Sequence, residues 1–206
     1  MIRVSIRSLL LVSLLLGAST AGWAQAKTPP ADPTFKLQGL DGKVVDLSAQ
    51  HGNVVLVSFG ATWCGPCISE LRALDELLAE YRNQPVKFFW VSVERVEEID
   101  NAGLKRYAKE RKLTFPVLRD TGKMVYLQFA ERQRLPMIVL LDKDGKVDTP
   151  VSFGMKSSPG DYKSDMRARL NKLLQIPSAE RSGAQSDAGR TATRAGHPAL
   201  SESERE

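Results

Sequence analysis

The stretch that decides the fold reads VVLVSFGATWCGPC and runs from Val54 to Cys67. It opens with a short, continuous, β-branched apolar run, which is typical of a central strand covered on both faces. It closes with Cys64 and Cys67 on either side of a Gly-Pro dipeptide. An amphipathic helix is predicted directly afterwards, because apolar residues recur at intervals of three and four with charges between them. These apolar residues are Leu71, Leu74, Leu77, Leu78 and Tyr81.

The order of strand, sharp break, cysteine pair and helix gives the two sulfur atoms unequal roles. In the first turn of a helix, unpaired backbone amides and the helix dipole stabilise a thiolate, the nucleophile of disulfide exchange. We expect Cys64 in that turn as the attacking thiol, and Cys67, one turn further and more buried, as the resolving thiol. Pro66 suits the first turn, where its missing amide hydrogen is not needed. Gly65 removes side-chain obstruction near the exposed sulfur.

Trp63 has two interpretations of equal weight. It either shields and flanks the disulfide or simply packs as an apolar side chain at the end of the strand. A Cys-x-x-Cys pair also occurs in metal sites. A closed Cys/His zinc site is excluded, because zinc needs four ligands, the chain adds only His51 and His197 to the two cysteines, and His197 falls in the tail predicted to be disordered. Copper(I) stays open, because two thiolates alone satisfy it, so a copper(I) carrier or chaperone is the alternative function. We expect no cofactor besides the disulfide and no resident metal.

The remaining pattern predicts one α/β domain at residues 35–176. Two short segments around Asp41-Gly42 predict an N-terminal β-hairpin. Further strands are expected at 53–59, 86–93, 115–118, 137–141 and 146–153, and further helices at about 97–112, 120–130 and 159–175. This alternation indicates βαβ units.

The two ends of the chain differ in composition from this domain. Residues 1–26 combine Arg3 and Arg7, an apolar stretch and small residues, which predicts a cleaved signal peptide and an exported, periplasmic protein. An uncleaved membrane anchor is the alternative, although the uncharged run falls short of the roughly 20 apolar residues that a spanning helix prefers. Residues 27–34 suit an extended linker. Residues 177–206 are predicted to be disordered, because burial there cannot offset the ordering entropy.

Export changes the interpretation of the cysteines, because an oxidising compartment permits stable disulfides. A bridge that closes so small a loop constrains the unfolded chain little, so reversible redox chemistry explains the pair better than a structural staple. The formal net charge of +5 is spread along the chain and includes Arg3 and Arg7. We therefore expect no nucleic-acid binding.

From about Phe35 to Gln175 the chain resembles the TlpA/ResA-like branch of the thioredoxin superfamily. The resemblance rests on the stretch from Val54 to Cys67, on Glu70, and on Leu135-Pro136 before a strand. It implies a thioredoxin fold, with a central mixed β-sheet flanked by helices, an N-terminal β-hairpin and an inserted helix-strand unit. It also implies an exported thiol:disulfide oxidoreductase, of a kind that serves cytochrome c or copper-centre maturation.

The same resemblance assigns roles that spacing alone does not. Pro136 matches a cis-proline beside the active disulfide that lines the substrate groove, whereas frequency alone favours a trans bond. Glu70 matches an acidic residue near the disulfide that tunes thiol pKa or relays protons, whereas spacing alone favours a solvated helix charge. Ser58 stands where thioredoxin has a buried aspartate, so no carboxylate relay is expected at that position. Gly60 replaces a common tryptophan, and Leu135 is bulkier than usual.

The direction of electron flow and the partners are predicted from the motif. The Gly-Pro dipeptide matches thioredoxin, a reductant at roughly −270 mV, rather than oxidants at roughly −120 mV. We therefore expect protein disulfides as substrates. A reductant in an oxidising compartment needs recharging, which predicts a membrane thiol donor of the DsbD or CcdA type. A monomer is expected.

Overall fold

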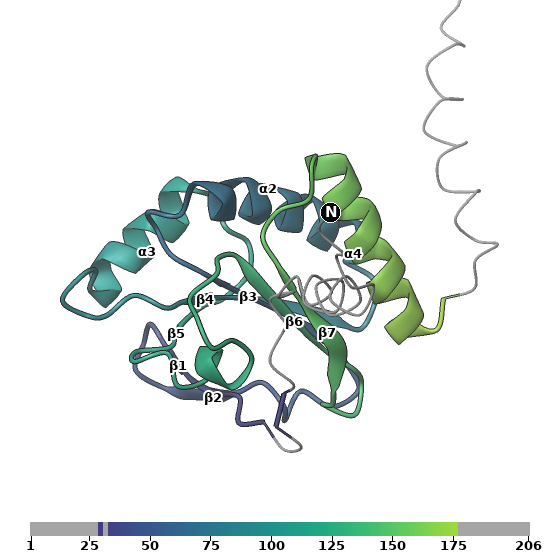
Figure 1. Cartoon of the computed structure of the whole chain (residues 1–206), viewed down its shortest axis with the longest axis horizontal. Helices are drawn as coiled ribbons and strands as arrows, with labels where there is room; N and C mark the ends of the chain where they lie inside the picture. Colours follow the sequence, from purple (N-terminus) through teal and green to yellow (C-terminus); the bar gives the residue numbers. More distant parts are fainter. Residues whose placement is uncertain (1–28, 31–32, 177–206) are drawn as a thin grey trace, which may run out of the picture.

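The computed structural model describes residues 29–30 and 33–176, so the predicted signal peptide, most of the linker and the predicted C-terminal tail lie outside the described residues. Seven strands form one mixed sheet in the order β2-β1-β5-β4-β3-β6-β7 (Figure 1). The strands are β1 Lys36–Gly39, β2 Val44–Asp46, β3 Val54–Gly60, β4 Val86–Ser92, β5 Val117–Arg119, β6 Met137–Leu141 and β7 Val147–Phe153. The helices are α2 Gly65–Glu80, α3 Asn101–Glu110, α4 Pro159–Leu174 and the 3-10 turn η1 Tyr126–Gln128.

Strand β3 is central, as the apolar run predicts. All seven of its residues are buried, and it pairs in parallel with β4 and antiparallel with β6. The predicted N-terminal hairpin is confirmed, since β1 and β2 pair antiparallel around a turn in which Gly42 takes the left-handed φ of +86°. The inserted unit adds α3 and β5, and β5 lies between β1 and β4.

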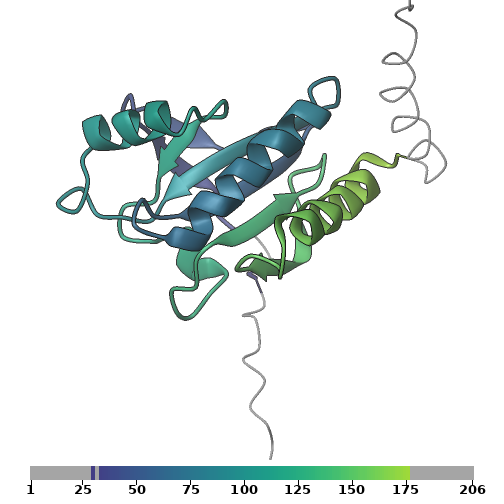
Figure 2. The ribbon, with the colours of Figure 1, turned by 90° about the horizontal axis from the view of Figure 1, so that it is seen from above.

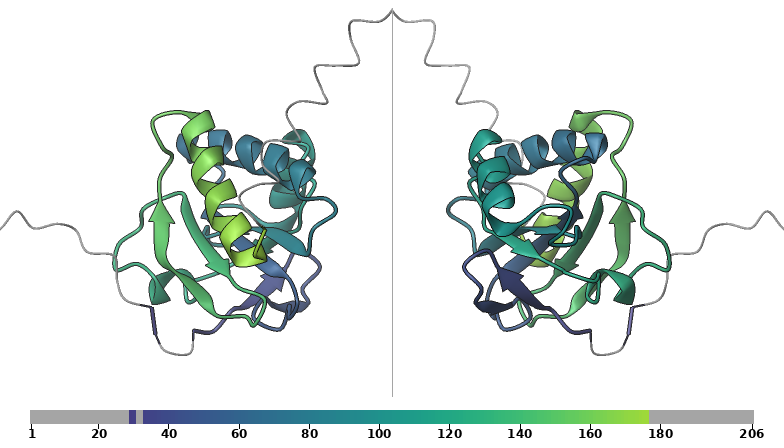
Figure 3. Two further views of the ribbon diagram at one scale, coloured as in Figure 1. Left: turned by 90° about the vertical axis from the view of Figure 1, so that its right-hand side faces the viewer. Right: turned by 90° about the vertical axis from the view of Figure 1, so that its left-hand side faces the viewer.

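The two faces of the sheet are covered differently. Helices α2, α3 and α4 lie over one face, and Figures 2 and 3 show the same layering from other directions. Leu74, Trp90 and Leu170 belong to the core on that side. The core on the opposite face includes Phe35, just before β1, and Phe129, just after η1. None of the helices in the described part is long and apolar enough to cross a membrane.

The helix predicted at 97–112 is shorter than expected. It begins at Asn101, because Asp100 is extended and its side chain accepts a hydrogen bond from Gly103 N at 2.6 Å, which caps the helix. The helix ends at Glu110. The following strand is also displaced, since β5 covers Val117–Arg119 rather than 115–118.

The prediction of a helix at 120–130 is wrong, because only the single 3-10 turn η1 forms there. Gly122 and Lys123 both have left-handed φ values, of +87° and +61°, which interrupt a right-handed helix. The Asp120 carboxylate instead accepts hydrogen bonds from Val125 N at 3.2 Å and Tyr126 N at 2.7 Å. This side-chain bonding to the backbone competes with helix formation and folds the segment into turns.

Candidate redox site

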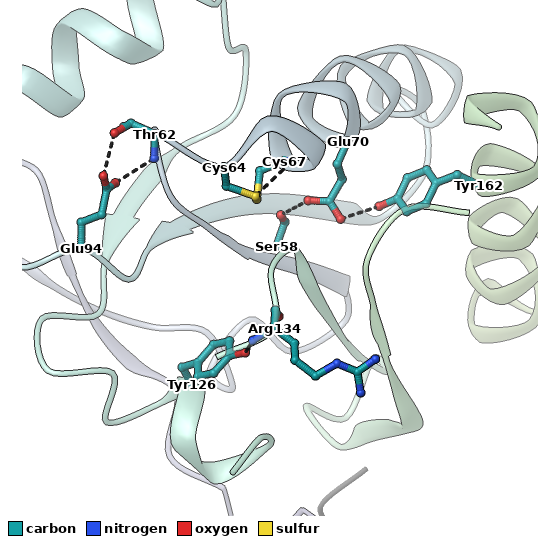
Figure 4. The surroundings of a disulfide bond; sticks show 9 residues. All are labelled: Ser58, Thr62, Cys64, Cys67, Glu70, Glu94, Tyr126, Arg134 and Tyr162. Carbon is teal, nitrogen blue, oxygen red and sulfur yellow. Dashed lines mark hydrogen bonds between the residues drawn. A yellow bond between two sulfur atoms is a disulfide. The ribbon is translucent and has the colours of Figure 1, made fainter. Parts of the chain in front are cut away.

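Cys64 and Cys67 form a disulfide, with their Cα atoms 5.3 Å apart (Figure 4). Cys64 is the N-cap of α2 rather than a residue of its first turn, and its Sγ accepts a hydrogen bond from Cys67 N at 3.2 Å. Pro66 lies in the first turn, as predicted. Cys64 therefore lies where the free amides and the dipole of α2 favour a negative sulfur.

The two cysteines differ in exposure in the predicted direction. Cys67 is fully buried, whereas Cys64 keeps 5% of its surface accessible. Trp63 is 65% exposed, which favours a residue flanking the disulfide at the surface over a packed hydrophobic shoulder. A Cβ atom on Gly65 would meet nothing within 4 Å, so its small size is not needed for packing within the described chain. Room for a substrate at Gly65 stays a prediction.

The residue before the predicted proline, Leu135, packs against the cluster that contains the disulfide. The Leu135-Pro136 peptide bond is cis, as the resemblance implies. Leu135 packs against Cys64 and Cys67, and the strand that follows, β6, pairs with the end of β3 through Met137 and Phe59. The segment that leads into β6 therefore lies next to the disulfide cluster. That Pro136 lines a substrate groove stays a prediction.

Glu70 is fully buried, so its interpretation as a solvated helix charge is wrong. Ser58 Oγ donates a hydrogen bond to Glu70 Oε2 at 2.6 Å, and Tyr162 Oη donates to Oε1 at 3.0 Å. Burial raises the pKa of Glu70 from its ordinary 4.5 to about 7, against a smaller lowering by these two hydrogen bonds. The carboxyl group can therefore gain and lose a proton close to neutral pH.

This network joins three elements, since Ser58 lies on β3, Glu70 on α2 and Tyr162 on α4 (Figure 4). Position 58 carries no carboxylate, as expected, but the Glu70 carboxylate reaches Ser58 from the helix. Tyr162, a buried residue of α4, was not predicted as a site residue. Its partnership with Glu70 was missed, because the two residues are 92 positions apart and no local pattern links them.

A second buried carboxylate, Glu94, holds the loop before the cysteines and was also missed. Thr62 donates to Glu94 twice, from N to Oε2 at 2.9 Å and from Oγ1 to Oε1 at 2.6 Å. Ser92 Oγ also donates to Oε2 at 2.9 Å, and Arg119 Nη1 donates to the Glu94 carbonyl at 3.1 Å. Figure 4 shows Glu94 and Glu70 on opposite sides of the disulfide. Polar residues at the carboxyl end of a buried parallel strand were the available signal.

We predict that Thr62→Val lowers the free energy of unfolding by about 2 kcal/mol, because it removes a hydrogen bond to a buried carboxylate without changing side-chain shape. Chemical denaturation of the oxidised protein measures this loss. The matched control is Thr114→Val, whose Oγ1 donates to Asp75 at the exposed surface. It should change stability by less than about 0.5 kcal/mol. Equal losses in both variants would contradict an anchoring role for Glu94.

Within ranges 29–30 and 33–176, no group of three or more His, Cys, Asp or Glu side chains is placed to hold a metal ion. The copper(I) alternative stays a prediction, because it concerns the reduced thiolates, whereas Cys64 and Cys67 are bonded to each other here.

Comparisons with known proteins show the family of the chain. The Redoxin family model matches residues 26–151. The thiol-disulfide oxidoreductase ResA of a Bacillus cereus strain is 32% identical over 115 residues, which cover 56% of this chain and 64% of that protein. The ResA protein of Geobacillus thermodenitrificans is 32% identical over 141 residues, covering 68% and 75% respectively.

A solved structure gives the same result for the fold. A thiol:disulfide interchange protein of the thioredoxin family from Chlorobium tepidum TLS superposes with a TM-score of 0.56 at 23% identity, covering 72% of this chain and 98% of that one. The thioredoxin fold and the TlpA/ResA-like resemblance predicted from the sequence are thereby confirmed.

Proposed function

Because the chain belongs to the Redoxin family, we propose that it is an exported thiol-disulfide oxidoreductase that reduces protein disulfides through Cys64 and Cys67. One observation carries this proposal. Cys64 caps helix α2 and keeps 5% of its surface exposed, whereas Cys67 is fully buried, so the two cysteines have the inequality that stepwise exchange requires. The names of the ResA relatives support the same activity.

The proposed reaction is a two-electron exchange. The Cys64 thiolate attacks one sulfur of the substrate disulfide, forms a mixed disulfide and releases the other substrate sulfur as a thiolate. The Cys67 thiolate then attacks Cys64 Sγ, restores the Cys64-Cys67 bond and releases the second substrate thiolate. The substrate gains two electrons and two protons, and the protein dithiol loses them.

Glu70 supports this cycle as a proton carrier. The Cys67 thiol must lose a proton before it attacks, and its burial opposes a charged sulfur. Because the pKa of Glu70 is about 7, its carboxylate can accept a proton at neutral pH at little cost in free energy. Ser58 Oγ, on the central strand β3, donates a hydrogen bond to this carboxyl group.

Compartment and partners belong to the same proposal. Residues 1–26 support export to the periplasm through a cleaved signal peptide. There the oxidised protein would be reduced again by a membrane thiol donor of the DsbD or CcdA type. We propose that it works as a monomer and that its clients include proteins of cytochrome c maturation.

Insulin reduction and a redox titration test the activity and its direction. The wild-type protein with dithiothreitol should reduce insulin faster than dithiothreitol alone, whereas the Cys64→Ser/Cys67→Ser double variant should not. Equilibration with glutathione should give a potential below that of glutathione. Absence of insulin reduction would contradict the activity, and a potential above glutathione would contradict the reductant direction.

A further inference from the structure

Trp90 carries a buried donor that the proposed reaction does not yet use. Its side chain is fully buried on β4, and its ring stacks on Tyr107 with centroids 5.4 Å apart. Among the described residues, Trp90 Nε1 has no hydrogen-bond partner. An indole nitrogen can only donate, and a buried donor without an acceptor costs free energy. Such a group calls for an explanation, and redox chemistry is one of the recognised explanations.

Gly60 lies between this donor and Cys67. A Cβ atom built on Gly60 would lie 2.6 Å from Trp90 Nε1 and 3.4 Å from Cys67 Sγ. The two atoms therefore border the same small space, which exists because position 60 has no side chain. Gly60 does not have a positive φ, so its backbone conformation does not require glycine. The absence of a side chain is what matters at this position.

When the disulfide is reduced, the Cys67 thiolate can become the acceptor that Trp90 Nε1 lacks. A sulfur in a disulfide is a weak acceptor, whereas a thiolate accepts strong, charge-assisted hydrogen bonds. We propose that Trp90 Nε1 donates a hydrogen bond to the Cys67 sulfur once the disulfide opens, and that Gly60 keeps the space in which they meet. This inference rests on the proposed dithiol-disulfide cycle.

A hydrogen-bond donor at this place would offset the cost of a negative charge on the buried Cys67 sulfur. Cys67 is fully buried, and Glu70 on the same helix adds a negative charge whenever it is ionised. Its two hydrogen-bond donors, Ser58 and Tyr162, are committed to the Glu70 carboxylate. A neutral N–H facing the sulfur stabilises the Cys67 thiolate without placing a permanent cation in the core.

The first test measures the pKa of the Cys67 thiol in a Cys64→Ser background, from the ultraviolet absorbance of the thiolate against pH. Adding Trp90→Phe should raise that pKa by about one unit, because the ring is kept and the donor is lost. Gly60→Ala should raise it as well, since the added methyl group separates donor and sulfur. The matched control is Phe88→Leu, a buried change on the same face of β4, which should leave the pKa unchanged. An unchanged pKa in Trp90→Phe, or an equal rise in Phe88→Leu, would overturn the proposal.

A second measurement needs no change at Trp90. In protein labelled with ¹⁵N-tryptophan and carrying only Cys64→Ser, the Trp90 indole N–H resonance should move downfield as Cys67 ionises. A resonance that stays constant through that titration would overturn the proposal. Both measurements are made at equilibrium without substrate, so they decide the role of Trp90 even if insulin reduction fails and the proposed function falls.

Discussion

Cys64→Ser is expected to lower the rate of insulin reduction by at least about a thousandfold. Cys64 is the only cysteine with accessible surface, and its place at the N-cap of α2 is where a thiolate is favoured. A serine hydroxyl fits the same cap but does not ionise near neutral pH and cannot form a disulfide. The loss should appear in the exchange rate, because serine is a good N-cap residue and the fold should stay intact. Circular dichroism of both proteins checks the fold.

The complementary variant, Cys67→Ser, separates the roles of the two sulfurs. It should also lose turnover, yet Cys64 can still attack a substrate disulfide, and without the second thiol the mixed disulfide persists. Non-reducing electrophoresis and mass spectrometry should then find captured clients on Cys64. The matched control is Cys64→Ser, in which the buried Cys67 should capture almost nothing. Equal capture by the two single variants would contradict the assignment of attacking and resolving thiols.

The parts of the fold that depend on local pattern could be predicted from the sequence. The buried strand β3 is marked by an unbroken β-branched run, and α2 by its three-four spacing of leucines. The hairpin turn is marked by Asp41-Gly42, since Gly42 supplies the left-handed φ that the turn needs. The cis bond before Pro136 could be predicted only through the family resemblance, because frequency alone favours trans.

The tertiary contacts of the site could not be predicted. Glu70 was marked as a site residue only by the family resemblance, and nothing in the sequence pairs it with Tyr162, 92 residues away. Glu94 follows a strand, but only the parallel pairing of β3 and β4 brings its carboxylate to Thr62. The helix predicted at 120–130 is absent for a local reason, since the Asp120 carboxylate accepts hydrogen bonds from Val125 N and Tyr126 N and so competes with helical bonding.

Glu70 also links stability to pH, and the sign follows from its raised pKa. Its pKa is about 7 in the folded protein against an ordinary 4.5, so the folded state binds the proton more tightly than the unfolded state. The contribution of Glu70 to the free energy of unfolding is therefore largest below pH 4.5 and is lost as the pH rises through 7. The difference in pKa corresponds to a loss of about 3 kcal/mol above pH 7.

Glu70→Gln should remove this pH dependence. We expect the free energy of unfolding of the oxidised wild type to fall by about 3 kcal/mol from pH 4 to pH 8 as Glu70 ionises. The variant should lack this fall, because glutamine never ionises. The matched control is Glu110→Gln, an exposed carboxylate at the end of α3, which should keep the wild-type slope. Insulin reduction by Glu70→Gln should also lose the rise in rate near pH 7 that a proton acceptor provides. If the variant kept the wild-type pH dependence of stability, Glu70 would be ionised in the folded protein well below pH 7 and could not serve as the proton acceptor of Cys67.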